Sequence, residues 1–363
     1  MTGASQSAVP VPRRVTVAVV MPVRNEEDEV ETTLAAVFAS TRAPDEIIVA
    51  DGMSTDRTVE RVRAFARAHD RAVTIVENPT LWCGGGRNRA IEQTRCDVIV
   101  LADFGNILDP DYIARMVAPF ERDETVDIVG SVFRLRVDSD FEHCVAGIHY
   151  FDNYTLERYS AAEREALLSQ VVAPGGNSIA FTRAIWMRLG GYPEWLARAQ
   201  DKMFSRKAHA VGAKVAVAWD AVVRVHVRRT PRQLFRQLLL YGRGYGQSHY
   251  VSAHSAKLTV LYGAVLGLLA GTVASPWIGT AGLALYAGYV AKAGPWKVYR
   301  AAPEKFRAIH LAMAPVALVC RDAGSILGHF YGWGEWLFDP RYRRQFVDYT
   351  RDAPAHRLHR LAR

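Results

Sequence analysis

The chain has 363 residues, of which 50% are apolar, and its formal net charge is +8 at pH 7. This length is enough for one large domain or two ordinary ones, and the basic excess favours an anionic partner: a phosphorylated ligand, a nucleic acid or an acidic membrane surface. The four cysteines (Cys83, Cys96, Cys144 and Cys320) are far apart and form no C-x-x-C pair, which argues against a zinc site or a disulfide framework.

Strand and helix patterns alternate through the first part of the chain. Residues 1–13 are polar and lack an apolar segment, so we expect a flexible leader and not a secretory signal. Strands are predicted at residues 15–22, 46–50, 73–76, 97–101, 128–137 and 214–217. Helices are predicted at residues 27–39, 56–68, 86–94 and 199–212, with a helical stretch of variable character between 143 and 169. The alternation is typical of an α/β fold whose mostly parallel sheet is covered on both faces.

Polar loops follow most of the predicted strands. They are residues 22–27 (PVRNEE), residues 51–56 (DGMSTD), residues 84–88 (GGGRN), Asp103, and Gln200 with Asp201. Open α/β sheets bind ligands at the carboxyl ends of their strands. Backbone N–H groups of glycine-rich turns bind phosphate, and carboxylates bind ribose or a divalent cation. The pattern favours a nucleotide-diphosphate ligand, although the glycine run by itself also fits a flexible turn before a helix.

The C-terminal part contains a long uncharged segment. No charged residue lies between Lys257 and Lys292, and Ser275-Pro276 near the middle of the segment favours a turn. One spanning helix needs about 20 apolar residues, so we interpret the segment as a hairpin of two short spanning helices. The flanking basic residues place both ends in the cytoplasm. The alternative is a pair of very apolar core helices.

A second apolar stretch, residues 308–320, ends at Arg321-Asp322. It is short for a span, and it fits either a third, tilted span or a helix in the membrane interface. Residues 332–336 (GWGEW) have the aromatic character of a headgroup boundary. The basic tail, residues 339–363, is expected to be solvated and, beside a membrane, to attract anionic lipid.

The loops resemble, in order and spacing, those of the inverting nucleotide-sugar glycosyltransferases of family two, which have the GT-A fold. The resemblance covers about residues 14–250. Its motifs are P-x-x-N-E-E at 22–27, D-G-x-S-x-D-x-T at 51–58, R-N-x-A at 87–90, a D-x-D-like segment at 103–105 with P-D-x-I at 110–113, G-G-Y-x-E at 190–194, and Gln200-Asp201 followed by Arg206. Residues 225–229 (VHVRR) and 236–242 (RQLLLYG) make the membrane-anchored transferases of exopolysaccharide or glycolipid assembly the most similar subtype.

The resemblance implies a division of the chain. A GT-A glycosyltransferase domain would occupy residues 14–225, and interfacial or acceptor-side helices would occupy residues 226–256. Residues 257–338 would form a transmembrane or membrane-associated helical region.

The resemblance also implies site residues. Asp201 would be the general base that takes the acceptor's proton. The donor-binding set would be Pro22, Val23, Arg24, Asn25, Glu26, Asp51, Ser54, Arg87 and Asp103. The residues facing the acceptor or a phosphate would be Gln200, Arg206, Arg236 and Arg243, and the metal ligands would be Asp103 and His226. His226 fits a strand residue on a solvated face equally well, and the two arginines of 236–243 also fit a cationic surface facing a membrane.

The sequence departs from the family pattern at three positions. Gly105 replaces the second Asp of D-x-D, Gln200 replaces the Glu before the catalytic-type Asp, and Gly52 replaces the second Asp of the D-D-x-S loop. A divalent cation, Mg²⁺ or Mn²⁺, is expected to bind weakly with one carboxylate there, unless arginines take over its role or activity has been lost. Leu240-Tyr241 stands where processive synthases have Arg-Trp, which favours addition of a single sugar.

The predicted function is transfer of one sugar from a nucleotide-diphosphate sugar to an acceptor hydroxyl with inversion. The acceptor would be lipid-linked or a glycolipid, and the catalytic domain would lie at the cytoplasmic face of the cell membrane. The alternatives are a catalytically silent glycosyltransferase-like membrane scaffold and, with less support, a nucleotidyltransferase. No nucleic-acid-binding module is recognisable, so the basic charge does not indicate a nucleic-acid partner.

Overall fold

The computed structural model describes residues 14–160, 162–163, 176, 178–249 and 253–352. Within these residues, one eight-stranded sheet has the order β3-β2-β1-β4-β7-β6-β8-β5. The strands are β1 (Val17–Val23), β2 (Glu46–Asp51), β3 (Thr74–Glu77), β4 (Val98–Leu101), β5 (Ile107–Leu108), β6 (Ile128–Arg136), β7 (Ile179–Thr182) and β8 (Val215–His226). The predicted α/β fold is confirmed, and its sheet is mixed. Strands β3-β2-β1-β4 pair in parallel, as do β6 and β8, whereas β7 is antiparallel to both of its neighbours.

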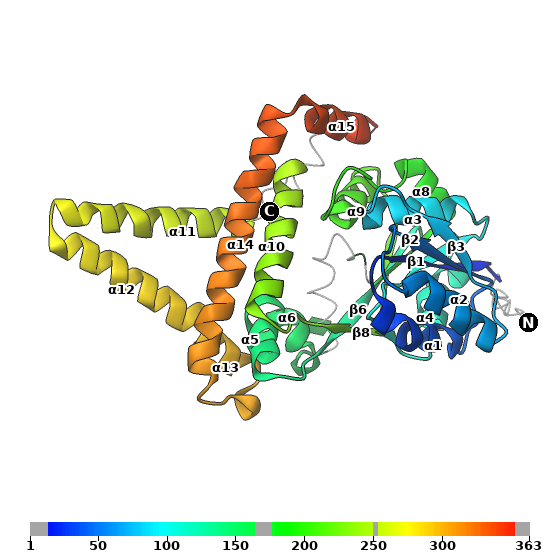
Figure 1. Cartoon of the computed structure of the whole chain (residues 1–363), viewed down its shortest axis with the longest axis horizontal. Coiled ribbons are helices and arrows are strands. Elements are labelled where there is room, and N and C mark those ends of the chain that lie inside the picture. The colour runs from blue at the N-terminus through cyan, green and yellow to red at the C-terminus, as the bar shows by residue number, and fades with distance from the viewer. Residues whose placement is uncertain (1–13, 161, 164–175, 177, 250–252, 353–363) are drawn as a thin grey trace, which may run out of the picture.

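The strand residues alternate between two cores. Val17, Val19 and Met21 of β1 face a core shared with α1 (Val30–Phe38), α2 (Thr58–Ala68) and α4 (Tyr112–Arg122). Ala18 and Val20 face the opposite core, shared with α3 (Cys83–Glu92), α8 (Arg183–Leu189) and α9 (Gln200–Ala210). Successive side chains of a strand point to opposite faces, so an unbroken apolar strand such as β1 must be covered on both sides, as Figure 1 shows.

A helical region follows the sheet. It consists of α5 (Asp140–His149), α6 (Phe151–Tyr154), α10 (Pro231–Gln247), α11 (Ala253–Ala270), α12 (Pro276–Ala293), α13 (Pro295–Ala301), α14 (His310–Phe338) and α15 (Pro340–Thr350). The short 3₁₀ turns are η1 (Glu27–Glu29), η2 (Leu156–Arg158), η3 (Gly271–Val273) and η4 (Pro303–Lys305). A third core joins α5, α10 and α14. In Figure 1, α10 and α14 lie side by side while α11 and α12 project sideways from them as a hairpin.

Glycines allow α10 and α14 to pack at very short range. A Cβ added to Gly328 of α14 would meet the carbonyl oxygen of Leu239 at 2.1 Å, and one added to Gly246 of α10 would meet that of His329 at 2.4 Å. Small residues spaced by four positions let two helix backbones approach closely. Helix α10, which follows β8 in the chain, therefore contacts α14 through backbone atoms.

The structure corrects several expectations about element bounds. Strand β8 is far longer than residues 214–217, because it follows β6 as far as His226. The glycines 84–86 lie in the buried first turn of α3 and not in a flexible turn, since a Cβ on Gly85 would meet Thr80 Oγ1 at 2.0 Å. The helical stretch at 143–169 is α5, α6 and η2 over its described part, and its later residues lie largely outside the described ones.

The C-terminal helices differ from expectation as well. The apolar stretch at 308–320 does not end at Arg321-Asp322: α14 continues to Phe338, because both charged side chains are buried and paired with each other. The part of the basic tail that the structure describes is helical, and Tyr349 of α15 donates to Gly191 O at 2.9 Å. The leader, residues 1–13, and residues 353–363 lie outside the described residues.

Candidate active site

Two loops at the carboxyl ends of β1 and β2 are joined by hydrogen bonds. Asn25 N donates to Ser54 Oγ at 2.9 Å, and Thr55 N donates to Asn25 Oδ1 at 2.8 Å. Asp51, buried at the end of β2, accepts from Ser54 N at 3.2 Å. Asn25 and Met53 have positive φ angles of 53° and 58°, which non-glycine residues rarely adopt. The predicted donor loops therefore form one structural unit, held in a strained shape of the kind found at functional sites.

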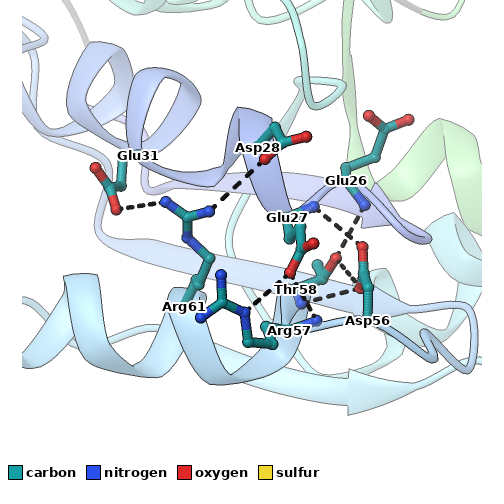
Figure 2. Close-up of polar contacts among 8 residues, drawn as sticks. All are labelled: Glu26, Glu27, Asp28, Glu31, Asp56, Arg57, Thr58 and Arg61. Carbon is teal, nitrogen blue, oxygen red and sulfur yellow. Dashed lines mark hydrogen bonds and ion pairs between the residues drawn. The ribbon is translucent and has the colours of Figure 1, made fainter.

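Some acidic side chains after Pro22 form hydrogen bonds and ion pairs within the protein, and others are left to contact a ligand. Figure 2 shows Asp56 accepting from the backbone of Glu27, and Glu27 paired with Arg57 at 3.3 Å. Glu26 N donates to Thr58 Oγ1 at 2.9 Å, whereas its carboxyl group points away from this network. Partial desolvation by the surrounding atoms and the negative charge of Glu29 raise the pKa of Glu26. The loop thus leaves the Glu26 carboxyl group available for a ligand.

Arg87 connects the donor side to the other half of the site. Its side chain, only 3% exposed, lies on α3 with Nη2 at 3.2 Å from Asp103 Oδ1. The same Nη2 donates to Gly176 O at 3.1 Å, and Gly176 N donates to Asp201 Oδ2 at 3.0 Å. Burial opposes the charge of Arg87, yet the nearby carboxylates, Asp103 above all, hold the pKa of its guanidinium above the ordinary value.

Asp201 stands at the first turn of α9. Its Oδ1 accepts from Lys202 N at 2.9 Å, so both carboxylate oxygens are oriented by backbone N–H groups. The preceding residue pair is unusual: Ala199 has a φ of 66°, and the buried Gln200 Oε1 has no hydrogen-bond partner within the described part of the chain. A helix N-terminus favours a negative charge, and a carboxylate held in this way is suited to accept a proton from a bound hydroxyl group.

Tyr241 of α10 was expected only to mark the lost Arg-Trp pair, and no role in the site was predicted for it. Burial and the charge of Asp201 raise the pKa of its hydroxyl group to about 12, and the positive charges of Arg198 and Arg228 act in the opposite direction. Arg228 also lies within electrostatic reach of Glu26. Helix α10 therefore brings Tyr241 to the Asp201 side of the site, and Arg228, which precedes this helix, acts electrostatically on both Tyr241 and Glu26.

Gly105 and Glu29 occupy the region of the missing second Asp. Gly105 has a φ of 82°, a conformation that disfavours any side chain. A Cβ placed there would lie 3.9 Å from Cδ of Glu29. A carboxylate from the first loop therefore stands beside the position that the D-x-D pattern would fill. The sequence signal was the long acidic run after Asn25, in which no residue beyond the P-x-x-N-E-E motif was given a role.

The remaining predicted residues have varied positions. His226 lies with Asp138 and Glu142, their ligand atoms within 4.8 Å of one another, and Asp103 is not in this group. Arg243 is held by Glu335 through two short hydrogen bonds, of 2.8 and 2.6 Å, so it is engaged within the helical region. Arg206 is buried in α9, one turn beyond Asp201, and Arg236 is exposed on α10. Arg24 is exposed beside the buried Pro22 and Val23 at the end of β1.

The known proteins that this chain resembles are named as glycosyltransferases. Residues 18–180 match the model described as Glycosyl transferase family 2. The O-antigen chain rhamnosyltransferase RfbN of Salmonella typhimurium is 26% identical over 223 residues, which are 61% of this chain and 69% of that protein. Glycosyltransferase AglE of Haloferax volcanii is 24% identical over 230 residues, 63% of this chain and 72% of that protein.

A solved structure has the same fold. The mannosyltransferase PcManGT from Pyrobaculum calidifontis, solved in complex with GDP-Man and Mn²⁺, aligns with a TM-score of 0.55 at 21% identity. The alignment covers 91% of this chain and 90% of that one. It supports the GT-A-like architecture with its helical C-terminal region.

Proposed function

We propose, because residues 18–180 match the model described as Glycosyl transferase family 2, that the chain transfers a single sugar from a nucleotide-diphosphate sugar to an acceptor hydroxyl group with inversion. The observation that carries the proposal is the connection of Asp103 to Asp201 through Arg87 and Gly176. It joins a carboxylate on the donor side to one on the acceptor side. An inverting transfer needs a base on the acceptor side and positive charge at the leaving diphosphate on the donor side, where Asp103 would help to hold a cation.

Asp201 acts as the general base. Its carboxylate accepts the proton of the acceptor hydroxyl group as that oxygen attacks the anomeric carbon. The bond from this carbon to the diphosphate oxygen breaks at the same time, and its electron pair leaves with the nucleoside diphosphate. Because the hydrogen bonds from Gly176 and Lys202 fix the carboxylate, little reorganisation is needed at the moment of reaction.

The donor would be held by the joined loops of β1 and β2. Pro22, Val23, Arg24 and Asn25 would contact the base and ribose together with Glu26, Asp51 and Ser54. A divalent cation would be held by Asp103 and Glu29, and when bound it supplies positive charge for the leaving diphosphate. The pairing of Asp103 with Arg87 leaves its second carboxylate oxygen for such a cation. Arg228 is a further positive charge on the Glu26 side.

The acceptor is proposed to be lipid-linked or a glycolipid. RfbN, by its name, acts on O-antigen chains, and two described helices, Ser255–Val273 and His310–Phe338, are long and apolar enough to cross a membrane. Basic residues on both sides of the uncharged segment favour a catalytic domain at the cytoplasmic face of the cell membrane. Gln200 and Arg206 beside Asp201, with Arg236 on α10, would then face the acceptor.

A catalytically silent scaffold is the second candidate, because Gly105 and Gln200 depart from the family pattern. The two are separated by measuring nucleotide release by the detergent-purified chain from UDP-, GDP- and dTDP-sugars, with and without Mn²⁺ or Mg²⁺, in the presence of a membrane lipid extract. Lipid-dependent release from one donor that is lost in Asp201→Asn supports the transferase. Nucleotide binding without release from any donor supports the scaffold.

A further inference from the structure

The outer part of the α11–α12 hairpin, between Tyr262 and Tyr289, is apolar on all sides, and most of its side chains are uncovered by the rest of the described chain. In Figure 1 it projects away from α10 and α14. Val260, Val273 and Trp277 are 71%, 97% and 82% exposed. A Cβ added at Gly263, Gly267 or Gly288 would meet no other atom within 4 Å. Soluble proteins rarely expose so continuous an apolar surface, so the hairpin requires an apolar environment outside the protein.

The base of the hairpin is fixed to α14 by polar contacts. Tyr262 of α11 and Tyr289 of α12 both donate to Asp322 Oδ2, at 3.0 and 2.5 Å. Arg321 donates to Tyr289 Oη at 3.0 Å and to Ile148 O at 3.2 Å. From Tyr289 onwards α12 packs into the core of α5, α10 and α14. Only the segment between these two tyrosines is therefore available to enter a membrane.

This available segment is too short to cross a bilayer. The part of α12 from Pro276 to Tyr289 rises about 20 Å at 1.5 Å per residue, whereas the hydrocarbon core is about 30 Å thick. The tip, residues 271–277 (GTVASPW), carries no charge that would emerge on the far side.

Several polar groups of the tip form hydrogen bonds within the tip. Ala274 N and Ser275 N donate to Gly271 O, both at 3.0 Å. The hydroxyl groups of Thr272 and Thr280 donate to the carbonyl oxygens of Leu269 and Trp277. Backbone within hydrocarbon must form its hydrogen bonds internally, and these bonds meet that requirement for much of the turn.

Helix α14 runs in a different direction from the hairpin. Figure 1 shows α14 on the hairpin's side of α10, with the hairpin leaving it sideways. If the hairpin enters the bilayer, α14 cannot cross the same bilayer. Its glycine face packs on α10, and its exposed side chains are largely apolar, including Leu311, Val319, Leu327, Phe330 and Phe338. A helix with an apolar face of this kind is stable at the boundary between headgroups and acyl chains.

We propose that the α11–α12 hairpin enters the lipid bilayer from one face without crossing it, and that α14 lies flat in the headgroup layer. This proposal rests on the membrane location proposed above and replaces the expected pair of spanning helices. The exposed Lys257, Lys292 and Arg300 at the base of the hairpin would then meet anionic headgroups. Arg321 and Asp322 would lie at headgroup depth, where a charged pair is less costly than at the bilayer centre.

The test places single cysteines in a full-length chain whose native cysteines are replaced by serine. Right-side-out and inside-out vesicles from expressing cells are treated with a membrane-impermeant maleimide. We expect Val273→Cys at the tip to be labelled from neither side until detergent is added. Arg307→Cys and Arg341→Cys, at exposed positions just before and just after α14, should both be labelled from the catalytic-domain side, as should Lys292→Cys.

Three results would overturn the proposal. Labelling of position 273 from the far side would establish a spanning hairpin, and labelling of positions 307 and 341 from opposite sides would establish a spanning α14. Labelling of position 273 from the catalytic-domain side would show that the hairpin is not inserted. Nucleotide release, measured separately in the same vesicles, reports on the proposed transferase, so loss of activity and a wrong topology are distinguished.

Discussion

Arg87 and Asp103 form a partly buried ion pair, with Nη2 and Oδ1 at 3.2 Å, although the two residues lie on α3 and just after β4. The same guanidinium nitrogen reaches Gly176 O, and Gly176 N reaches Asp201. One nitrogen of Arg87 therefore contacts both the donor-side carboxylate and the residue whose backbone N–H binds the proposed general base. Arg87 is thus a positioning residue in our interpretation.

Replacing Arg87 with Lys should reduce activity more than binding. A lysine keeps the charge, but it has no planar fork that can reach both Asp103 and Gly176 O. We expect kcat to fall by about 10²-fold with a smaller change in KM, since positioning contributes at this scale, and stability to fall by about 1–3 kcal/mol because a buried carbonyl group loses its partner. Arg89→Lys, at an exposed position on the same helix, is the control. If kcat were the same in Arg87→Lys and Arg89→Lys, Arg87 would have no positioning role.

Asp201→Asn should abolish transfer and preserve binding. The amide oxygen of Asn can accept from only one of the two backbone N–H groups that Asp201 binds, those of Gly176 and Lys202, and the amide cannot take a proton. A lost general base costs about 10²–10⁴-fold in rate, which nucleotide release measures, while calorimetry should find the nucleotide affinity unchanged. Asp220→Asn, at an exposed carboxylate paired with Arg115, serves as the control. Retention of full activity in Asp201→Asn would show that another group is the base.

Much of the sheet domain could be predicted from sequence because its signals are local. An apolar run such as residues 15–22 must be buried on both faces, and the loop after it must lie at the carboxyl edge. The glycine run at 84–86 did not reveal its role, since glycine is common both in flexible turns and at close contacts. Only the neighbours reveal the second cause, with Thr80 Oγ1 2.0 Å from a Cβ on Gly85.

The parts that escaped prediction depend on long-range contacts. The closeness of Glu29 to Gly105 and the position of Tyr241 near Asp201 arise from segments far apart in the chain. The continuation of α14 through Arg321-Asp322 follows from a buried pairing with each other and with Tyr262 and Tyr289, which no sequence pattern displays. Pairing makes two charges compatible with a buried helix, and pairing is a tertiary property.

Glu29→Gln should weaken cation binding. If Glu29 supplies the carboxylate that the D-x-D pattern lacks at Gly105, its removal leaves Asp103 alone. We expect Mn²⁺ affinity, measured by electron paramagnetic resonance in the presence of nucleoside diphosphate, to fall by about 10-fold or more, the scale found for lost outer-shell partners and ligands. Asp28→Asn, on the neighbouring residue with a side chain 93% exposed, should leave the affinity unchanged. The same small effect in both variants would mean that Glu29 is not a ligand.

Glu26→Gln should stabilise the protein at neutral pH while weakening nucleotide binding. The folded protein raises the pKa of Glu26 above its ordinary value of 4.5, so the folded state holds its proton to higher pH than the unfolded chain. Stability is therefore lost as pH rises through the interval above 4.5. Thermal unfolding in detergent should show a higher midpoint for Glu26→Gln at pH 7 and no difference at pH 4. A lower midpoint at pH 7 would indicate that the carboxylate is stabilising.

Gly328→Ala and Gly334→Ala test the joint between α10 and α14 with opposite expected signs. Both glycines lie on α14, and alanine is the better helix former by about 1 kcal/mol. A Cβ on Gly334 would meet no atom within 4 Å, so this variant should be stabilised by up to that amount. A Cβ on Gly328 would meet Leu239 O at 2.1 Å and force the two helices apart.

Such overpacking costs about 1–3 kcal/mol, so Gly328→Ala should unfold at a lower temperature than the parent, whereas Gly334→Ala should unfold at the same or a higher one. Transfer should also fall only in Gly328→Ala, because α10 carries Tyr241 to the Asp201 side of the site. If both variants were equally stable, the two helices would be separable without cost, and the helical region could not fix the position of the catalytic domain relative to the membrane.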